Sequence, residues 1–285
     1  MIGDRHRWSN NPRGGVGVAR AAIIHSNMGH QMTPVLNYLN LVPPFASLTL
    51  AGFKMREHPR EKRWAMFLVV SLLIIVTVIL TQNFLEWSGQ SFTLRYDEFL
   101  FRLDQPFGQP SFAMARIAEH IPQLYSLSMF AYCGLYGALS AVIGFYFLTQ
   151  PIREVKIVLR TFLLTLLALF CYILLPASGP LYAFGRFPKV PVFAPRILHL
   201  TAPPNCMPSV HLTVALLILY FLWPWKPSRI FGAVYVLLIA FAALASGEHY
   251  FVDLLLAFPF TAVLLYLGGS SIPQGGTDIL RDNAR

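Results

Sequence analysis

The sequence predicts an all-α membrane protein, a polytopic bundle of six transmembrane helices. Hydrophobic residues make up 55% of its 285 residues and charged residues only 12%, which is far from the averages of soluble domains. The apolar residues form runs close to the roughly 20 residues that a helix needs to cross a bilayer. Short polar segments separate these runs, and several of them carry Lys or Arg. Insertion into a bilayer is therefore the first expectation.

Six runs have spanning length or nearly so, and they are residues 64–84, 124–148, 157–175, 208–223, 230–245 and 250–267. Basic residues cluster before the first run, between the second and third, and between the fourth and fifth. Positively charged loops tend to stay in the cytoplasm. Residues 85–123, 176–207 and 246–249 are then expected on the opposite, non-cytoplasmic face, and we expect the plasma (inner) membrane of a prokaryote.

The N-terminal region, residues 1–63, is basic and precedes the first run. Within it, residues 34–53 are long enough to cross, but Pro43 and Pro44 interrupt them. A seventh span would place the N-terminal arginines outside, so we expect a re-entrant or interfacial segment here. The catalytic membrane domain is expected to cover residues 64–268.

Two further segments flank the predicted spans. Residues 91–119 mix charged residues with Phe and Leu at helical spacing, which predicts an amphipathic helix on the outer surface. Residues 269–285 are rich in Gly, Ser and Asp and are expected to be a disordered tail.

The net charge of +9 could indicate nucleic acid as a partner. Many of the Lys and Arg residues, however, lie in the N-terminal region and in the short loops that flank the apolar runs. Anionic lipid headgroups explain this distribution better, so we expect the bilayer as the partner and no nucleic acid.

Two polar strings stand out, at residues 205–213 and 246–253. The first contains Pro208, Ser209 and His211, and the second contains His249 and Asp253. One predicted span enters the membrane after the first string and the next returns to the second, so both imidazoles are expected on the outer face. A pair of ionisable side chains that meets there needs a reason, which makes the two strings candidates for a functional site.

His249 and Asp253 are four residues apart, a spacing that brings side chains together on a helix. A carboxylate that accepts from one ring nitrogen leaves the other nitrogen with its lone pair as a nucleophile. The alternative is that the two residues only satisfy each other at a helix end, which leaves His211 unexplained.

Pro208 is expected to open a helix, with the amides of Ser209, Val210 and His211 unpaired at its positive end. This arrangement predicts an anion site, to which the Ser209 hydroxyl adds a donor. His211 could then protonate a leaving oxygen. Taken alone, the string is also compatible with an ordinary helix cap.

The two strings resemble the motifs P-S-G-H and S-R-x5-H-x3-D of the phosphatidic acid phosphatase type 2 superfamily, over residues 124–267. The resemblance implies a six-span fold with its motifs on one face and chemistry without a metal or other cofactor. It implies His249 as the nucleophile, Asp253 as its orienting carboxylate, His211 as the general acid and Ser209 as a phosphate donor.

The chain departs from these motifs at several positions. Val210 replaces the glycine of P-S-G-H, which keeps a backbone donor, and Ala242 and Ala243 stand where the family has Ser-Arg. A phosphate-binding guanidinium is therefore missing from that position.

The remaining candidates for a phosphate-binding cation lie in a proline-rich loop. Lys189 and Arg196 have the spacing of the family's K-x6-R-P motif, although Ile197 replaces its proline. Arg186 is a rival donor.

Together with His-Tyr-x-x-Asp and Pro-x-x-Gly-Pro, these departures resemble the branch of inositol phosphorylceramide and sphingomyelin synthases, which transfer headgroups between lipids. The sequence thus predicts a lipid phosphoester phosphatase or phosphotransferase that works through a phosphohistidine. The choice depends on whether water or an alcohol is the acceptor.

Two other classes of function stay open. One is a lipid-binding or lipid-moving protein of the same fold whose active site has decayed, which the two alanines favour. The other is a metal hydrolase with Cys206, His211, His249 and Asp253 as ligands, although their spacing matches no zinc signature.

Overall fold

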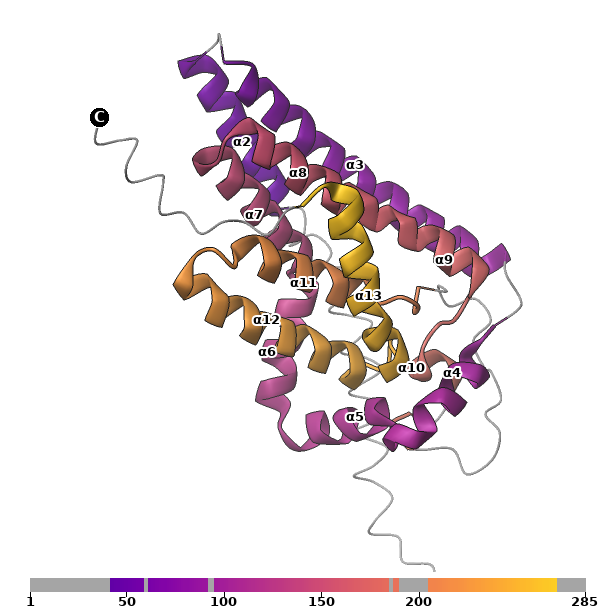
Figure 1. The fold of residues 1–285 in the computed structure, drawn as a ribbon. Helices are drawn as coiled ribbons and strands as arrows, with labels where there is room; N and C mark the ends of the chain where they lie inside the picture. Colours follow the sequence, from indigo (N-terminus) through magenta and orange to yellow (C-terminus); the bar gives the residue numbers. More distant parts are fainter. Residues whose placement is uncertain (1–41, 59–60, 92–94, 185–186, 190–204, 271–285) are drawn as a thin grey trace, which may run out of the picture.

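The computed structural model describes residues 42–58, 61–91, 95–184, 187–189 and 205–270 (Figure 1). In these residues every regular element is a helix. The elements are α2 (Val42–Glu57), α3 (Lys62–Ser91), α4 (Asp97–Asp104), η1 (Gln105–Phe107), α5 (Pro110–His120), α6 (Pro122–Cys133), α7 (Leu135–Thr149), α8 (Ile152–Leu163), η2 (Leu164–Leu167), α9 (Ala168–Leu174), α10 (Pro180–Ala183), α11 (Val210–Leu222), α12 (Lys226–Ala245) and α13 (Phe251–Gly268). The prediction of an all-α fold is confirmed for these residues.

Four helices are long and apolar enough to cross a bilayer, and they are α3, the continuous run from α8 to α9, α12 and α13. The pair α6 and α7 makes a fifth if it is taken as one span, although it is bent by 53° at Gly134. The predicted span at 208–223 is a shorter apolar helix, α11, of 13 residues. These helices identify an integral membrane protein.

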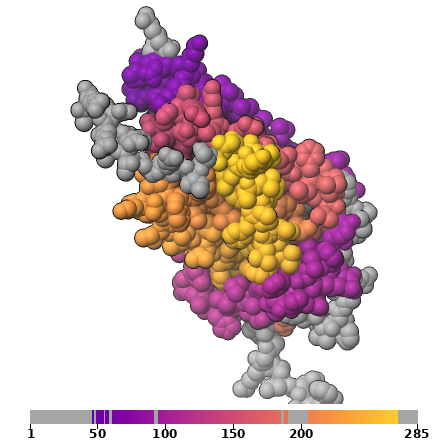
Figure 2. All heavy atoms as spheres, viewed as in Figure 1, coloured from indigo at the N-terminus to yellow at the C-terminus, as the bar shows by residue number. Residues whose placement is uncertain are grey.

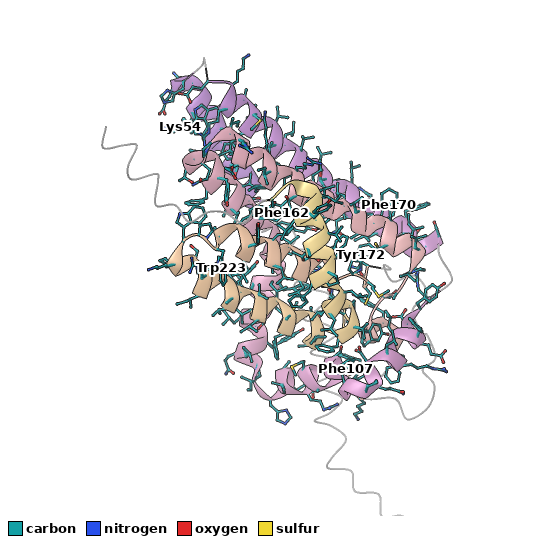
Figure 3. All side chains as sticks on the ribbon, viewed as in Figure 1. Lys54, Phe107, Phe162, Phe170, Tyr172 and Trp223 are labelled. Carbon is teal, nitrogen blue, oxygen red and sulfur yellow. The ribbon has the colours of Figure 1, made fainter. Side chains whose placement is uncertain are left out.

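The outward surface of the long helices is apolar. Phe170 on α9 is 66% exposed and points away from the bundle, whereas Tyr172 two residues later is buried (Figure 3). Leu72, Leu73 and Leu80 on α3 are also more than half exposed. In water such a surface would be unfavourable, but lipid tails solvate it, which agrees with the spans assigned above.

The core lies between α11, α12 and α13 and the helices that surround them. Leu217, Ile239 and Leu264 are fully buried there, together with Phe147 of α7. α11 packs against α7, α12 and α13, and Figure 2 shows α13, in yellow, on the face of the molecule beside α11 and α12. α11 is thus a central helix, which suits a short apolar element that carries site residues at its start.

α2 packs against α3 and α7. The prediction of a re-entrant or interfacial segment covers residues 34–53, of which 34–41 lie outside the described residues. From Val42 the chain forms one continuous helix. Its prolines at positions 43 and 44 fall in the first turn, where a missing N–H removes no helical hydrogen bond.

The prediction of a single amphipathic helix over residues 91–119 is wrong. The chain forms two helices there, α4 and α5, because Gly108 and Gln109 both have a positive φ, of 74° and 57°, and turn the backbone between them. Asp97 and Asp104, expected at the surface, are buried. Both carboxylates point inward because backbone amides of other segments bind them, as described below.

Candidate active site

The candidate site lies where several chain breaks meet at one end of the bundle. The start of α11, the turn between α12 and α13, the short helix α10 and the pair α4 and α5 all lie at this end (Figure 1). Backbone hydrogen bonds tie these segments together: Leu181 donates to Gly247, Cys206 to Ala177, and Ser209 to the carbonyl of Asp253.

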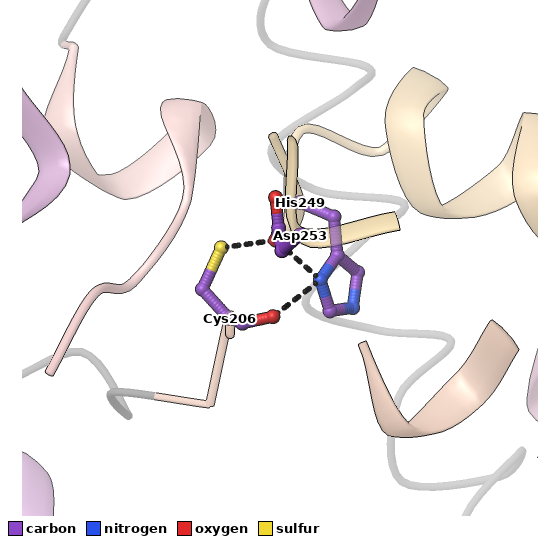
Figure 4. A group of neighbouring side chains, drawn as sticks. All are labelled: Cys206, His249 and Asp253. Atoms are coloured by element: carbon purple, nitrogen blue, oxygen red, sulfur yellow. Dashed lines mark hydrogen bonds and ion pairs between the residues drawn. The ribbon is translucent and has the colours of Figure 1, made fainter. Parts of the chain in front are cut away.

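His249 lies just before α13 and Asp253 in its first turn. His249 Nδ1 is 2.9 Å from Asp253 Oδ2 and 3.0 Å from the carbonyl oxygen of Cys206 (Figure 4). Both neighbours are acceptors, so Nδ1 carries the proton and shares it between them. The other ring nitrogen, Nε2, therefore keeps its lone pair, and its neighbour at 3.4 Å is the Ser209 hydroxyl.

His211 lies in the first turn of α11 with its ring centroid 5.9 Å from that of His249 and the two planes at 73°. The two imidazoles expected on one face are therefore neighbours, although 38 positions separate them in the sequence. Nδ1 of His211 is 3.0 Å from the hydroxyl of Tyr132, which lies at the end of α6. That hydroxyl donates to Glu248 Oε2 at 2.8 Å.

The helix α11 begins at Val210, two residues after Pro208, the residue that was expected to open it. Ser209 is the N-cap, and its hydroxyl accepts from the amide of Leu212 at 3.4 Å. The Ser209 amide donates to Asp253 and is not free for an anion. The amides of Val210 and His211 begin the helix and have no acceptor within it. They are the backbone donors that the helix offers to an anion.

The predicted cations are placed less completely. Lys189 is exposed, whereas Arg186 and Arg196 lie outside the described residues. Ala242 and Ala243, which stand at the family's Ser-Arg positions, are fully buried near the end of α12. They contribute packing and no polar group.

Three of the four residues considered as metal ligands lie close together. Cys206 Sγ, His249 and Asp253 lie within 4.8 Å of one another, and Cys206 Sγ donates to Asp253 Oδ2 at 2.6 Å. Burial and the charge of Asp253 raise the pKa of the Cys206 thiol well above its usual value, so the thiol keeps its proton. Ligand atoms around a tetrahedral zinc are about 3.3–3.8 Å apart. The two shortest separations here, 2.6 Å from Cys206 Sγ and 2.9 Å from His249 Nδ1 to Asp253 Oδ2, are instead those of hydrogen bonds.

Asp97, at the start of α4, binds the loop before α10. It accepts from the amides of Ser178 and Gly179 at distances of 2.9–3.2 Å and from the hydroxyl of Tyr250 at 3.0 Å. Burial raises the pKa of this carboxyl, and the two amide hydrogen bonds oppose the shift. Asp97 thereby holds the residue that follows His249.

Asp104, at the end of α4, caps α13. It accepts from the amides of Phe251 and Val252 at 2.8 and 3.0 Å. These two amides begin the helix and therefore have no acceptor within it. Burial raises the pKa of Asp104 to about 6, while the two amides act in the opposite direction. This carboxyl fixes the helix start that lies between His249 and Asp253.

We expect the Asp104→Asn variant to change how stability depends on pH. The pKa of Asp104 is about 6 in the folded protein, and its ordinary value is 3.8. Between these two pH values the folded protein therefore binds one more proton than the unfolded protein does. Ionisation of Asp104 then destabilises the fold as the pH rises from about 4 to about 6, with a slope of at most about 1.4 kcal/mol per pH unit. Melting temperatures of both proteins in detergent, measured across this range, should show a slope that the Asn variant lacks. Parallel pH profiles would contradict the assignment.

The sequence analysis did not identify Tyr132, Glu248, Asp97 and Asp104 as site residues. Asp97 and Asp104 had a signal, since carboxylates in a largely apolar segment need partners, but the amphipathic pattern assigned them to the surface. Glu248 directly precedes His249 and was not given a role. Tyr132 lies within an apolar run and had no signal.

A sequence model of the phosphatidic acid phosphatase type 2 (PAP2) superfamily matches residues 98–267, more than half of the chain. The chain belongs to the PAP2 superfamily. The match begins within α4 and ends in α13, so it includes Asp104 and all three predicted catalytic residues. Searches of curated proteins and of solved structures gave no match. PAP2 membership indicates a phosphoesterase that acts on a lipid substrate.

Proposed function

We propose that this PAP2 protein is a lipid phosphoester phosphatase or phosphotransferase that works through a phosphohistidine on His249. The observation that carries the proposal is the state of the His249 ring. Nδ1 is held by Asp253 and Cys206, Nε2 is left with a lone pair, and the ring of His211 is 5.9 Å away by centroids.

In the first half-reaction His249 Nε2 attacks phosphorus in line and the bond to the leaving oxygen breaks. His211 gives that oxygen the proton of its Nε2. The positive charge that develops on His249 is balanced by Asp253, whose Oδ2 also accepts from Cys206. Ser209 Oγ, 3.4 Å from His249 Nε2, and the first amides of α11 are the proposed donors to the phosphate oxygens.

In the second half-reaction an acceptor hydroxyl loses its proton to His211 and attacks phosphorus, and the bond to His249 breaks. With water as the acceptor the protein is a phosphatase. With a lipid or sugar hydroxyl it is a phosphotransferase, as the resemblance to the sphingomyelin synthase branch predicts. Arg186, Lys189 and Arg196 are the proposed cations for the phosphate charge, since α12 offers none at Ala242 and Ala243.

The proposed topology has six crossings, with the bent pair α6 and α7 as the second and α11 as the fourth. The basic loops around positions 54–63, 151–160 and 226–229 then lie in the cytoplasm. The candidate site lies at the opposite ends of these helices and faces the outer leaflet. A prokaryotic plasma membrane is the proposed location.

An assay of purified protein against phospholipids, prenyl phosphates and ceramide tests the proposal. Free phosphate indicates hydrolysis, and a new phospholipid indicates transfer. We expect one of these products, its formation to survive a strong chelator, and its inhibition by vanadate, which mimics pentacoordinate phosphorus. Loss of turnover on chelation would favour the metal hydrolase instead.

A lipid-binding protein without chemistry is the second candidate, favoured by the buried alanines at positions 242 and 243. It predicts that the lipids bind without any product. Vanadate distinguishes the two, because only an intact phosphoryl-transfer site is expected to be stabilised against heat by vanadate in a manner that requires His249.

A further inference from the structure

Glu248 is a carboxylate beside a site that is proposed to bind an anion. It is half-buried, and in the part of the chain that the structure describes it pairs with no Lys or Arg within 4.0 Å. Its Oε2 instead accepts from the hydroxyl of Tyr132 at 2.8 Å. A negative charge in this place repels phosphate, so the chemistry needs a reason for it.

The hydroxyl of Tyr132 has one proton, and it donates that proton to Glu248. The same oxygen is 3.0 Å from His211 Nδ1, but the two rings are stacked face to face. The Tyr132 oxygen therefore lies over the face of the imidazole, out of the plane in which an Nδ1–H would point. Tyr132 contacts His211 through its ring, and Glu248 holds Tyr132 by its hydroxyl.

The proton donor of the first half-reaction is the imidazolium form of His211. In that form both ring nitrogens carry protons, and one of these can be given to the leaving oxygen. A carboxylate that acts through a stacked ring favours this cationic form, which gives Glu248 a role that requires no contact with the phosphate.

The Tyr132 ring also stabilises the cation directly. It stacks on the His211 ring with centroids 4.0 Å apart and planes at 17°, an arrangement in which an aromatic face attracts a positive charge. Tyr132 itself lies in the last turn of α6, which ends at Cys133, and the kink at Gly134 follows two residues after it.

The backbone of Glu248 is held in place by a neighbouring loop. Gly179, with φ of 95°, packs directly on the carbonyl group of Glu248 and also approaches the carbonyl of Gly247. Asp97 binds the Gly179 amide at 2.9 Å. The carboxylate is therefore attached to a rigid part of the site, as a positioning group requires.

We infer that Glu248 and Tyr132 form a second positioning unit that holds the His211 ring and stabilises its imidazolium. This inference rests on the proposed phosphoester chemistry. Asp253 supports the nucleophile on one side of the phosphorus, and Glu248 acts through Tyr132 on the proton donor for the leaving group. Neither residue of this second unit touches the phosphate.

The test compares leaving groups, because a good leaving group needs little proton donation. The probes are phosphatidic acid in mixed micelles, which must expel an alkoxide, and p-nitrophenyl phosphate, which expels a stable phenolate. The second half-reaction uses His211 with either probe, so release of the leaving group is measured in the first turnover. We expect Tyr132→Phe to lower this rate on phosphatidic acid by roughly 10- to 100-fold and on p-nitrophenyl phosphate by less than about 3-fold. Glu248→Gln should shift the ratio in the same direction by less, because Gln keeps an acceptor for the Tyr132 hydroxyl.

Tyr235→Phe is the matched control. Tyr235 on α12 is also a buried tyrosine, and its hydroxyl donates to the carbonyl of Ala131, the residue before Tyr132, at 3.0 Å. Its removal deletes one buried hydrogen bond beside the same helix end and should leave the ratio of the two activities unchanged.

The outcomes separate the inference from the proposed function. Equal losses on both probes for Tyr132→Phe, or a shift of the ratio by Tyr235→Phe as well, would overturn the positioning unit. Retained turnover in His249→Ala would overturn the proposed function instead. Wild-type protein that turns over neither probe would overturn both.

Discussion

Replacement of His249 by Gln is expected to lower turnover of the lipid substrate by about 10⁴-fold or more. Removal of the nucleophile deletes the covalent route, and losses of this order follow when a nucleophile of a coupled catalytic unit is removed. Gln is chosen because its side chain is polar and close in size, which limits damage to a position that is 1% exposed. Product release from wild-type and variant protein in vesicles measures the effect.

A direct observation of the intermediate strengthens this experiment. Wild-type protein quenched during turnover of ³²P-labelled substrate should retain label in alkali and lose it in acid, as a phosphoramidate does. His249→Gln should retain no such label. His120→Gln is the control, since His120 is an exposed histidine on α5 whose ring bonds the carbonyl of Arg116 in its own helix. Label that persists in His249→Gln would assign the nucleophile to another residue.

Replacement of Gly179 by Ala is expected to destabilise the protein by roughly 3 kcal/mol or more and to remove most of the activity. Gly179 has φ of 95° and ψ of 162°, a region that side chains other than glycine rarely adopt. A Cβ there would also meet the carbonyl group of Glu248 inside contact distance and the oxygen of Gly247 at 2.8 Å. Both neighbours are backbone atoms, so the loop that carries His249 must move.

Gly108→Ala separates backbone strain from the clash. Gly108 also has a positive φ, of 74°, but a Cβ there would have nothing within 4 Å. This variant should lose about 1 kcal/mol and keep its activity. Melting temperatures and turnover in detergent, measured for both variants, check the comparison. Similar losses in the two variants would mean that the close approach of Gly179 to Glu248 does not matter.

Several features of the site could be predicted because their physical cause is local in the sequence. The length of the apolar runs reflects the thickness of a bilayer, and long helices occupy five of the six predicted runs when the bent pair is counted as one. The contact of His249 with Asp253 follows from their four-residue spacing. It forms even though His249 lies before α13 rather than within it, because Asp253 is in the first turn.

Other features could not be predicted because their partners are distant in the chain. Asp97 and Asp104 have hydrophobic neighbours at helical spacing, a pattern that cannot distinguish a charged face in water from one that binds amides. Their partners, near Ser178 and Phe251, are 81 and 147 positions away. The cost of burying a carboxylate is met here by backbone donors that only folding assembles.

The sequence by itself determined that this protein is a helical membrane protein and that His211, His249 and Asp253 come together at one place in the fold. Composition and short spacings carry that information because bilayer thickness and helical periodicity act on consecutive residues. Only the tertiary structure decided what surrounds these residues, namely the aspartates of α4 and the chain from His211 through Tyr132 to Glu248. Such contacts depend on how separate helices pack, which short-range patterns do not encode.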